Sequence, residues 1–337
     1  MKQNWMTSMV LTGQRASDGG DFTYRCVWFF FHVTFSLFIP SFIHSYILSF
    51  NHSFIHSFIR CRLTENGKVL AVTGPLWLPS WTQGRFLLPL VTADLKFILA
   101  KNSFCLRSNS TAHQYRVHID KFLVKLSRVH VNAAVAAKIE TRLSKSPALY
   151  PIRTTKARIF TIPQGTKHYE TEVFGAGATV VPNLCYLMLT TTRASQGEYG
   201  LCPFRFQHFN LTSLCMSIDG TSRPSPNGYT NIIWEGKNAN YMQMYYDLFD
   251  ANIKVNEGCS INLSEYPQNF CIFKLDLGYF LTQSHDHIEN KKLSNCRLSL
   301  TFSGASNNES LSLIVYSESN STFYINSQRE VTRDYML

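Results

Sequence analysis

The chain has 337 residues, which is enough for one large or two medium domains, and a hydrophobic share of 45 % suits a globular core. Its aromatic share of 14 % favours strands over helices. The nine cysteines form no C-x-x-C pair, which argues against a zinc ribbon or a thioredoxin-like motif and favours reduced thiols inside cells. The net charge of +10 is concentrated in residues 96–170, which hold 14 Lys and Arg against 3 Asp and Glu.

The first 95 residues differ in composition and pattern from the rest of the chain. Residues 27–50 contain no Asp, Glu, Lys or Arg and are as long as a bilayer span, which predicts a signal anchor. The alternative rests on a repeat, because Ser-Phe-Ile-His-Ser occurs at residues 41–45 and again at 53–57. A short tandem repeat in DNA would give this pattern, and the stretch would then be a gene-model artefact or a non-functional leader. Residues 63–95 have no clean period and are expected to be a poorly ordered linker.

A basic strand and a short helix are predicted next. Apolar residues alternate through residues 115–129, and the phase shift between Ile119 and Phe122 predicts a β-bulge. An amphipathic helix is predicted over residues 132–142, ending before Pro147. Its apolar stripe recurs every four residues at Val131, Val135, Ile139 and Leu143.

A series of strands follows, with long loops between them. Strands are predicted over residues 156–162, 184–191, 209–218 and 270–277, and a helix over residues 240–249. The dipeptide Asp219-Gly220 is a typical hairpin turn. A closing meander spans residues 296–325, with separate apolar runs at 298–302, 311–316 and 323–325. Within it, the alternating residues that we expect to face the interior are Leu298, Leu300 and Phe302.

The predicted fold is therefore mostly β, an antiparallel β-sandwich or jelly roll with one or two short helices. An irregular or hydrophobic N-terminal segment precedes it. The predicted division is a leader over residues 1–95 and a domain over residues 96–337, whose basic approach covers residues 96–170.

Residues capable of catalysis or metal binding are sparse, and each has a plainer interpretation. His285-Asp286-His287 could place two imidazoles on one side of a strand, but it lies in a polar stretch typical of a loop. Cys202 and His208 could act as nucleophile and base, yet Cys202 precedes a proline in a turn. Gly175-Ala-Gly177 lacks the third glycine of a dinucleotide loop. The sequence predicts no catalytic residue, no cofactor and no metal site.

The candidate site is the basic block. It could contact nucleic acid or an acidic partner, or it could simply be a solvated face. Few aromatic residues interleave in its helical part, so only sequence-independent contact with phosphates is predicted. Its members are Lys121, Lys125, Arg128, Lys138, Arg142, Lys145, Arg153, Lys156 and Arg158.

Five short stretches occur in one order along the chain and carry a resemblance to a known family. They are Asn-Ser-Phe-Cys-Leu at 102–106, Ala-Leu-Tyr-Pro-Ile-Arg at 148–153, Phe-Thr-Ile-Pro-Gln-Gly at 160–165, Cys-Pro-Phe-Arg-Phe-Gln-His-Phe at 202–209 and Leu-Ile-Val-Tyr-Ser-Glu at 313–318. Together with the charged tail they resemble the capsid-type proteins of Polinton (Maverick) elements and adintoviruses.

The resemblance implies a double jelly-roll major capsid protein that forms trimeric capsomers in a virion. It covers residues 100–335, the C-terminal jelly roll and its approach, so a shortened copy from an integrated virus or transposon is expected. Its place would be the virion, or the nucleus or cytoplasm of the cell that makes it. Its partners would be copies of itself, other capsid subunits and nucleic acid.

A second hypothesis comes from another class of protein. If residues 27–50 span a membrane, the chain would be a type II membrane protein with an extracellular β-sandwich that binds a ligand or receptor. Its glycosylation triplets would then be used, although triplets arise by chance in a chain so rich in Asn, Ser and Thr. They begin at Asn51, Asn109, Asn210, Asn262, Asn308 and Asn320.

Overall fold

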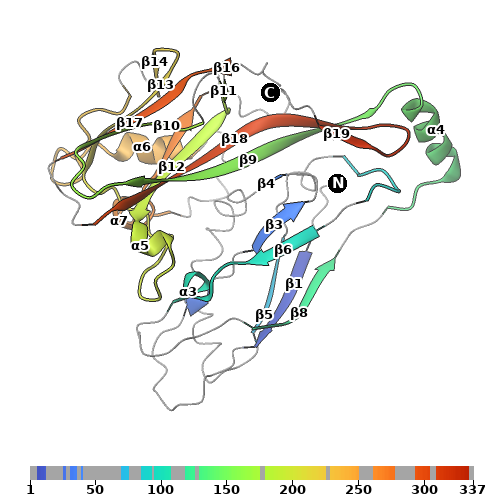
Figure 1. The fold of residues 1–337 in the computed structure, drawn as a ribbon, viewed down its shortest axis with the longest axis horizontal. Coiled ribbons are helices and arrows are strands. Elements are labelled where there is room, and N and C mark those ends of the chain that lie inside the picture. The colour runs from blue at the N-terminus through green and yellow to red at the C-terminus, as the bar shows by residue number, and fades with distance from the viewer. Residues whose placement is uncertain are drawn as a thin grey trace. The chain divides into compact units, whose positions relative to one another are not determined.

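The computed structural model divides the chain into two compact units (Figure 1). The first unit is Met1–Thr155 with Asn320–Leu337, and the second is Lys156–Ser319. The boundaries fall within two long strands, β9 (Ala148–Ile162) and β18 (Leu311–Ile325). The structure describes residues 6–12, 26–27, 31–35, 39–40, 70–75, 85–92, 95–107, 118–125, 129–174, 179–224, 228–249, 261–277, 293–303 and 309–333.

The second unit is built from antiparallel sheets, which confirms the predicted fold class. One sheet has the order β10-β17-β13-β14, and in another β12 lies between β15 and β18. A two-stranded sheet joins β11 to β16. The strands are β10 (His168–Glu172), β11 (Thr179–Val180), β12 (Leu184–Thr191), β13 (Leu211–Ile218), β14 (Thr221–Arg223), β15 (Ile272–Asp276), β16 (Leu293–Ser294) and β17 (Cys296–Phe302).

Three short helices connect these strands. The predicted helix over residues 240–249 is α6 (Met242–Leu248), and α5 (Thr192–Ser195) and α7 (Tyr266–Asn269) were not predicted. Both unpredicted helices are four residues long, too short for a 3.6-residue period to show in the sequence.

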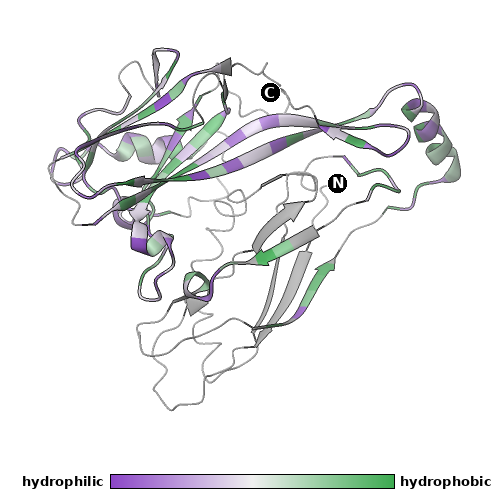
Figure 2. Ribbon diagram, viewed as in Figure 1, coloured by the Kyte–Doolittle hydropathy of each residue, from purple (hydrophilic) through white to green (hydrophobic). Residues whose placement is uncertain are grey.

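The interior face of β17 follows the predicted alternation. Leu298 and Leu300 are fully buried and Phe302 is 3 % exposed, whereas Arg297, just before Leu298, is exposed and Ser299 and Thr301 between them are half-buried. Hydrophobic and hydrophilic residues alternate in the strands of this unit because successive side chains point to opposite faces (Figure 2). The register predicted for the closing meander is therefore confirmed.

The closing strand β18 corrects one prediction. The runs at residues 311–316 and 323–325 were expected to be separate strands, but they form one continuous strand of 15 residues. Ser317, Glu318 and Ser321 in its middle are buried despite their polarity. Backbone pairing explains why the strand is continuous. β12 pairs with β18 as far as Glu318, and β19 (Val331–Arg333) pairs with β18 from Phe323 onward.

The predicted hairpin turn at Asp219-Gly220 joins β13 to β14. Both residues have positive φ, 47° at Asp219 and 82° at Gly220, as a type I′ turn requires. The turn needs a left-handed backbone at both positions, and Asp and Gly are residue types that adopt this conformation readily.

The cysteines in the described strands carry free thiols. Cys185, Cys271 and Cys296 are buried, but Cys215 is only half-buried, because its position on β13 alternates with the buried Leu214 and Met216. Burial raises the pKa of the Cys185 and Cys271 thiols and raises that of Cys296 to about 11. These buried thiols stay protonated near neutral pH and are poor nucleophiles.

The first unit contains small sheets, two of them three-stranded. Their orders are β5-β1-β8 and β4-β3-β6, and β2 pairs with β7. The strands are β1 (Met6–Thr12), β2 (Cys26–Val27), β3 (Phe31–Phe35), β4 (Ile39–Pro40), β5 (Leu70–Pro75), β6 (Leu95–Leu99), β7 (Leu106–Arg107) and β8 (His118–Lys125), with α3 (Asn102–Cys105) between β6 and β7.

The predicted bulge lies on β8. Its partner strand pairs Val10 with Lys121 and Leu11 with Ile119, so Asp120 is the extra residue. This is the position at which the sequence alternation changes phase. The phase shift therefore reports a real irregularity in strand pairing.

A second part of the first unit, which we call the arm, consists of residues 85–92, 129–155 and 320–333. Its core holds Tyr150, Ile152, Phe323 and Ile325, and residues 85–92 pack against it through Leu87, Leu88 and Val91. The rings of Tyr150 and Phe323 stack with centroids 4.7 Å apart. Residues 85–92 lie within the stretch for which the sequence predicts a poorly ordered linker.

The predicted membrane segment over residues 27–50 falls mainly outside the described residues. Where the structure describes it, the backbone forms β3, β4 and part of β2. No helix in the described part of the chain is long and apolar enough to cross a membrane.

Candidate basic interface

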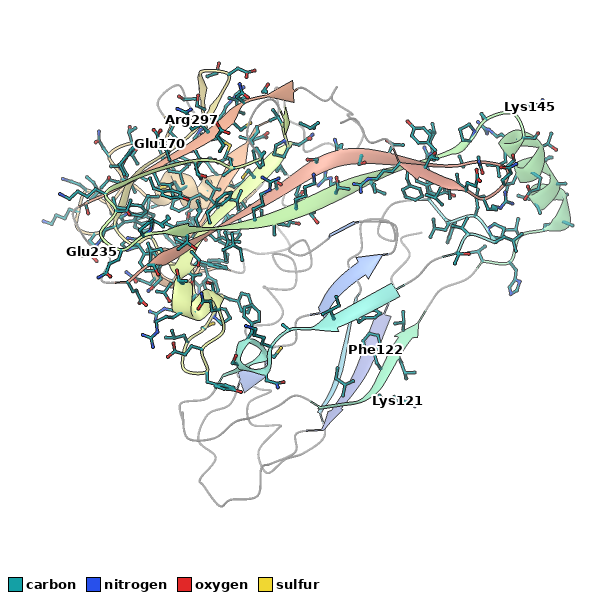
Figure 3. All side chains as sticks on the ribbon, in the orientation of Figure 1. Lys121, Phe122, Lys145, Glu170, Glu235 and Arg297 are labelled. Atoms are coloured by element: carbon teal, nitrogen blue, oxygen red, sulfur yellow. The ribbon has the colours of Figure 1, made fainter. Side chains whose placement is uncertain are left out.

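The nine predicted basic residues fall into separate groups. Lys121 is exposed on β8, where Lys125 also lies, and Arg128 is outside the described residues. Lys156 and Arg158 are exposed on β9 in the second unit. The group that the structure brings together lies on the arm, with Lys138 and Arg142 on helix α4 (Ala133–Leu143), Lys145 just after it and Arg153 on β9 (Figure 3).

Helix α4 matches its predicted range to within one residue. Asn132 caps its first turn, because its side-chain oxygen accepts the N–H of Ala134 at 3.1 Å. Ser144 closes the other end, where its backbone N–H donates to the carbonyl of Glu140 at 2.9 Å. Capping at both ends satisfies backbone groups that the helix itself leaves open.

The apolar stripe of α4 is buried only at its C-terminal end. Leu143 is 6 % exposed and Ile139 is half-buried, but Val135 and Val131 are each 49 % exposed. A step of four residues turns the helix by about 400°, so a stripe repeating every four drifts about 40° per step. The stripe thus starts on the solvent side of the helix and reaches the core only at Leu143.

The same geometry gathers cations on the exposed side. Lys138 and Arg142 are four residues apart, so their side chains lie next to each other on one face, with Val135 one turn earlier. Lys145 follows the end of the helix and is also exposed (Figure 3). No acidic side chain in the described residues forms an ion pair with Lys138, Arg142 or Lys145.

The acidic residue of the helix is engaged elsewhere. Glu140 accepts a hydrogen bond from Nη2 of Arg329, and Nε of the same guanidinium donates to the carbonyl of Pro89 at 3.0 Å. One side chain from the turn between β18 and β19 therefore joins the helix to residues 85–92. Only 12 % of the Arg329 side chain is exposed, so it is desolvated on formation of these bonds.

Further bonds fix residues 85–92 to the start of β9. The hydroxyl of Tyr150 donates to the carbonyl of Phe86 at 3.0 Å, and Nη1 of Arg85 donates to the carbonyl of Leu149 at 2.6 Å. Burial raises the pKa of Tyr150, so its hydroxyl remains a donor at physiological pH. Sequence reasoning missed Arg85 and Arg329, because their partners lie 64 to 240 positions away and leave no local signal.

The suggested Cys202–His208 pair does not have the geometry of a nucleophile and base. Nδ1 of His208 accepts the backbone N–H of Asn210 at 2.9 Å, and the ring stacks on Trp234 with centroids 4.4 Å apart. Nε2 lies 3.3 Å from the side-chain amide of Gln268. Both ring nitrogens of this buried imidazole are thus occupied by structural contacts, and burial lowers its pKa.

The other suggested sites are not visible. His285-Asp286-His287 and Gly175-Ala-Gly177 both lie outside the described residues. Among the residues that are described, no group of three or more His, Cys, Asp or Glu side chains could hold a metal ion. The arrangement that remains is a rigid, exposed basic helix that can attract anions but offers no activated nucleophile.

Comparison with solved structures shows which fold class the chain has. No protein-family model matches the sequence, and no curated protein matches it. Among solved structures, VP54 of the virus PBCV-1, fitted into a reconstruction of the virophage Sputnik, aligns with a TM-score of 0.52 at 12 % identity, covering 100 % of this chain and 90 % of VP54. The fold is that of the viral jelly-roll capsid proteins.

Two further structures are similar at lower scores. A quasi-atomic model of the PBCV-1 virus capsid aligns with a TM-score of 0.47 at 12 % identity, over 100 % of this chain and 90 % of that one. The Sputnik virophage structure aligns with a TM-score of 0.46 at 10 % identity, over 99 % and 82 %. The jelly-roll likeness to VP54 extends over the whole chain, whereas the sequence motifs cover only residues 100–335.

Proposed function

We infer that this chain is a structural, capsid-like protein that acts by packing against copies of itself and carries no catalytic activity. The observation that carries the inference is the jelly-roll fold shared with VP54. The sequence motifs over residues 100–335 resemble a capsid family independently of that comparison. Fold and sequence resemblance thus favour the same class of protein.

The inference includes a specific assembly state and place. Its units would be trimeric capsomers that contact other capsid subunits in a virion, after synthesis in the nucleus or cytoplasm of a host cell. We further infer descent from an integrated virus or transposon. The motifs begin near residue 100, which favours a shortened copy, whereas the alignment with VP54 covers 90 % of that protein.

Exposed apolar side chains in the second unit support self-association. Ile159 and Tyr246 are each 62 % exposed, and Met242 is 45 % exposed. Large apolar side chains in solvent are the ones that a subunit contact would cover, with a gain of about 25 cal/mol for each Å² removed from water.

The experiment is to purify the full-length chain and measure its mass over a wide concentration range by sedimentation velocity, with electron microscopy of the same samples. We expect trimers and larger ordered assemblies that grow with concentration. A chain that stays monomeric at every concentration and salt condition would overturn the inference. A double variant, Ile159→Ser with Tyr246→Ser, is expected to weaken assembly without lowering the melting temperature, because both side chains are exposed.

The origin is tested in the genome. A gene for a packaging ATPase, a protein-primed polymerase or an integrase beside this one is expected. An ordinary host-gene neighbourhood without any of these would contradict the viral or transposon origin and leave the assembly inference standing.

A further inference from the structure

The exposed cations on helix α4 are uncompensated. Lys138 and Arg142 lie on one side of the helix and the exposed Lys145 follows its end, and the described residues offer these three cations no acidic partner. The acidic residue of the helix, Glu140, lies on another side and is bound to Arg329. About 160° separates Glu140 from Arg142 around the helix axis, since each residue turns it by about 100°. The cations are therefore available to an outside ligand.

The helix that presents them is held in place before any ligand arrives. Leu143 is buried in the arm, Asn132 caps the first turn and Arg329 joins Glu140 to the carbonyl of Pro89. A surface that is already ordered loses little conformational entropy on binding. Binding through these three side chains would need no rearrangement of the helix backbone.

The distribution of charge favours a polyanion as the ligand. The first unit, which contains α4, holds 20 Lys and Arg against 8 Asp and Glu, while the second holds 12 against 14. The α4 surface of a second copy carries the same positive charge, so two such surfaces repel each other even where other surfaces of the chain associate. An anionic partner gains from the whole field of the first unit as well as from the three direct contacts.

The composition of the exposed side distinguishes between polyanions. A helix that lies in a lipid surface needs large apolar residues such as Trp, Phe or Leu, but the apolar residue here is Val135, surrounded by alanines. Single-stranded nucleic acid is bound by stacking on aromatic side chains, and residues 133–145 contain none. Small side chains with spaced cations suit the phosphate backbone of a duplex.

We propose that Lys138, Arg142 and Lys145 contact the phosphate backbone of double-stranded nucleic acid without reading its sequence. The proposal rests on the capsid-like function, because an assembly that encloses a genome meets a duplex. In it the helix lies against the duplex and the arm acts as its rigid support. Neutralising a phosphate with each cation releases counterions, so affinity falls as salt rises.

The test uses the full-length protein and labelled DNA duplexes of scrambled sequence, with binding measured by fluorescence anisotropy across salt concentrations. The variant combines Lys138→Gln, Arg142→Gln and Lys145→Gln. The control variant removes equal charge from the second unit through Lys167→Gln, Lys237→Gln and Arg297→Gln, all at exposed positions outside the predicted basic block. Circular dichroism and thermal melting establish that both variants fold.

Each phosphate contact contributes about 0.9 to the slope of log affinity against log salt, so the α4 variant is expected to lose about 2.7 from the slope. The control variant should lose less than one such contact. Equal slopes for the two variants would overturn the proposal, because only total charge would then matter. Loss of self-association or of binding to anionic vesicles, with the duplex slope unchanged, would overturn it in favour of a second copy or a lipid surface.

Sedimentation of the same variants without DNA separates this proposal from the capsid-like function. Assembly that persists in the α4 variant while the slope stays unchanged rejects the nucleic-acid contact alone. Failure of the wild-type chain to assemble rejects the capsid-like function, whatever the slope shows.

Discussion

The guanidinium of Arg329 donates to the carboxylate of Glu140, which lies 189 positions earlier in the chain. The same guanidinium reaches the carbonyl of Pro89, so one side chain joins the turn after β18, helix α4 and residues 85–92. Arg329 has a positive φ of 66°, which aims its side chain from a tight turn held by Asn326. Arg329 therefore helps to hold the basic helix in place, together with the buried Leu143.

Replacing Arg329 should therefore loosen the arm more than replacing its acidic partner. Arg329→Met removes both the bond to Glu140 and the bond to Pro89, at a cost of about 1–3 kcal/mol. Glu140→Gln should cost less than about 1 kcal/mol, because the Glu140 side chain is 54 % exposed and a surface ion pair contributes little. Hydrogen exchange of residues 85–92 and 133–143 measures the difference, and faster exchange in Glu140→Gln than in Arg329→Met would contradict it.

Acid should destabilise the second unit through His208. Burial lowers the pKa of this imidazole below its ordinary 6.5, so the folded chain favours the neutral ring. Below about pH 6.5 the unfolded chain takes up a proton that the folded chain resists, and stability falls as pH falls through the lowered folded pKa. The structural reason is that a second proton would sit on Nδ1, facing the N–H of Asn210.

The measurement is the urea midpoint between pH 8 and pH 5 for the wild-type chain and for His208→Gln. One histidine contributes a slope of at most about 1.4 kcal/mol per pH unit. The variant loses the stack on Trp234, so its urea midpoint is expected to be lower at every pH. The midpoint of the variant should change less with pH than that of the wild-type chain. Parallel curves for the two proteins would show that another group is responsible. Glu235 is the charged group that opposes the shift, since it raises the pKa of His208.

A methyl group at Gly228 should be costly for a local steric reason. Gly228 has a φ of 68°, and a Cβ there would lie 2.6 Å from the carbonyl oxygen of Leu214, which bonds the N–H of Tyr229 at 2.9 Å. We expect Gly228→Ala to cost at least about 2 kcal/mol, from left-handed backbone strain and the clash together.

Gly220→Ala provides the matched control. Gly220 has a φ of 82° but nothing within 4 Å of the added Cβ, so only the backbone strain of about 1–2 kcal/mol applies. Thermal melting of both variants measures the comparison. A Gly220 variant that melts below the Gly228 variant would show that the contact with Leu214 does not limit this position.

Sequence patterns located the local elements well where the signal repeats over several residues. The alternation in residues 296–302 specified both β17 and its buried face, and the phase shift after Ile119 located the bulge at Asp120. Local patterns failed where polarity and structure disagree. The polar middle of β18 suggested a break, but pairing with β12 carries the strand through the buried Glu318.

The candidate site was predicted less completely. Charge density along the chain identified the basic block, and a family resemblance favoured a capsid fold that the likeness to VP54 supports. A count of charges along the sequence does not show which element each residue lies on, however. It therefore could not separate Lys121 on β8 from Lys138 and Arg142 on α4. The arm holds four of the nine predicted residues, namely Lys138, Arg142, Lys145 and Arg153.

The sequence by itself determined β17, helix α4 and the turn at Asp219-Gly220, because side-chain period and backbone preference act over a few residues. The tertiary structure alone decided which part of the α4 stripe is buried and which cations are left without partners. Burial and ion pairing depend on which distant residues the fold places next to a side chain. The residue that the fold places next to Glu140 is Arg329, 189 positions away in the sequence.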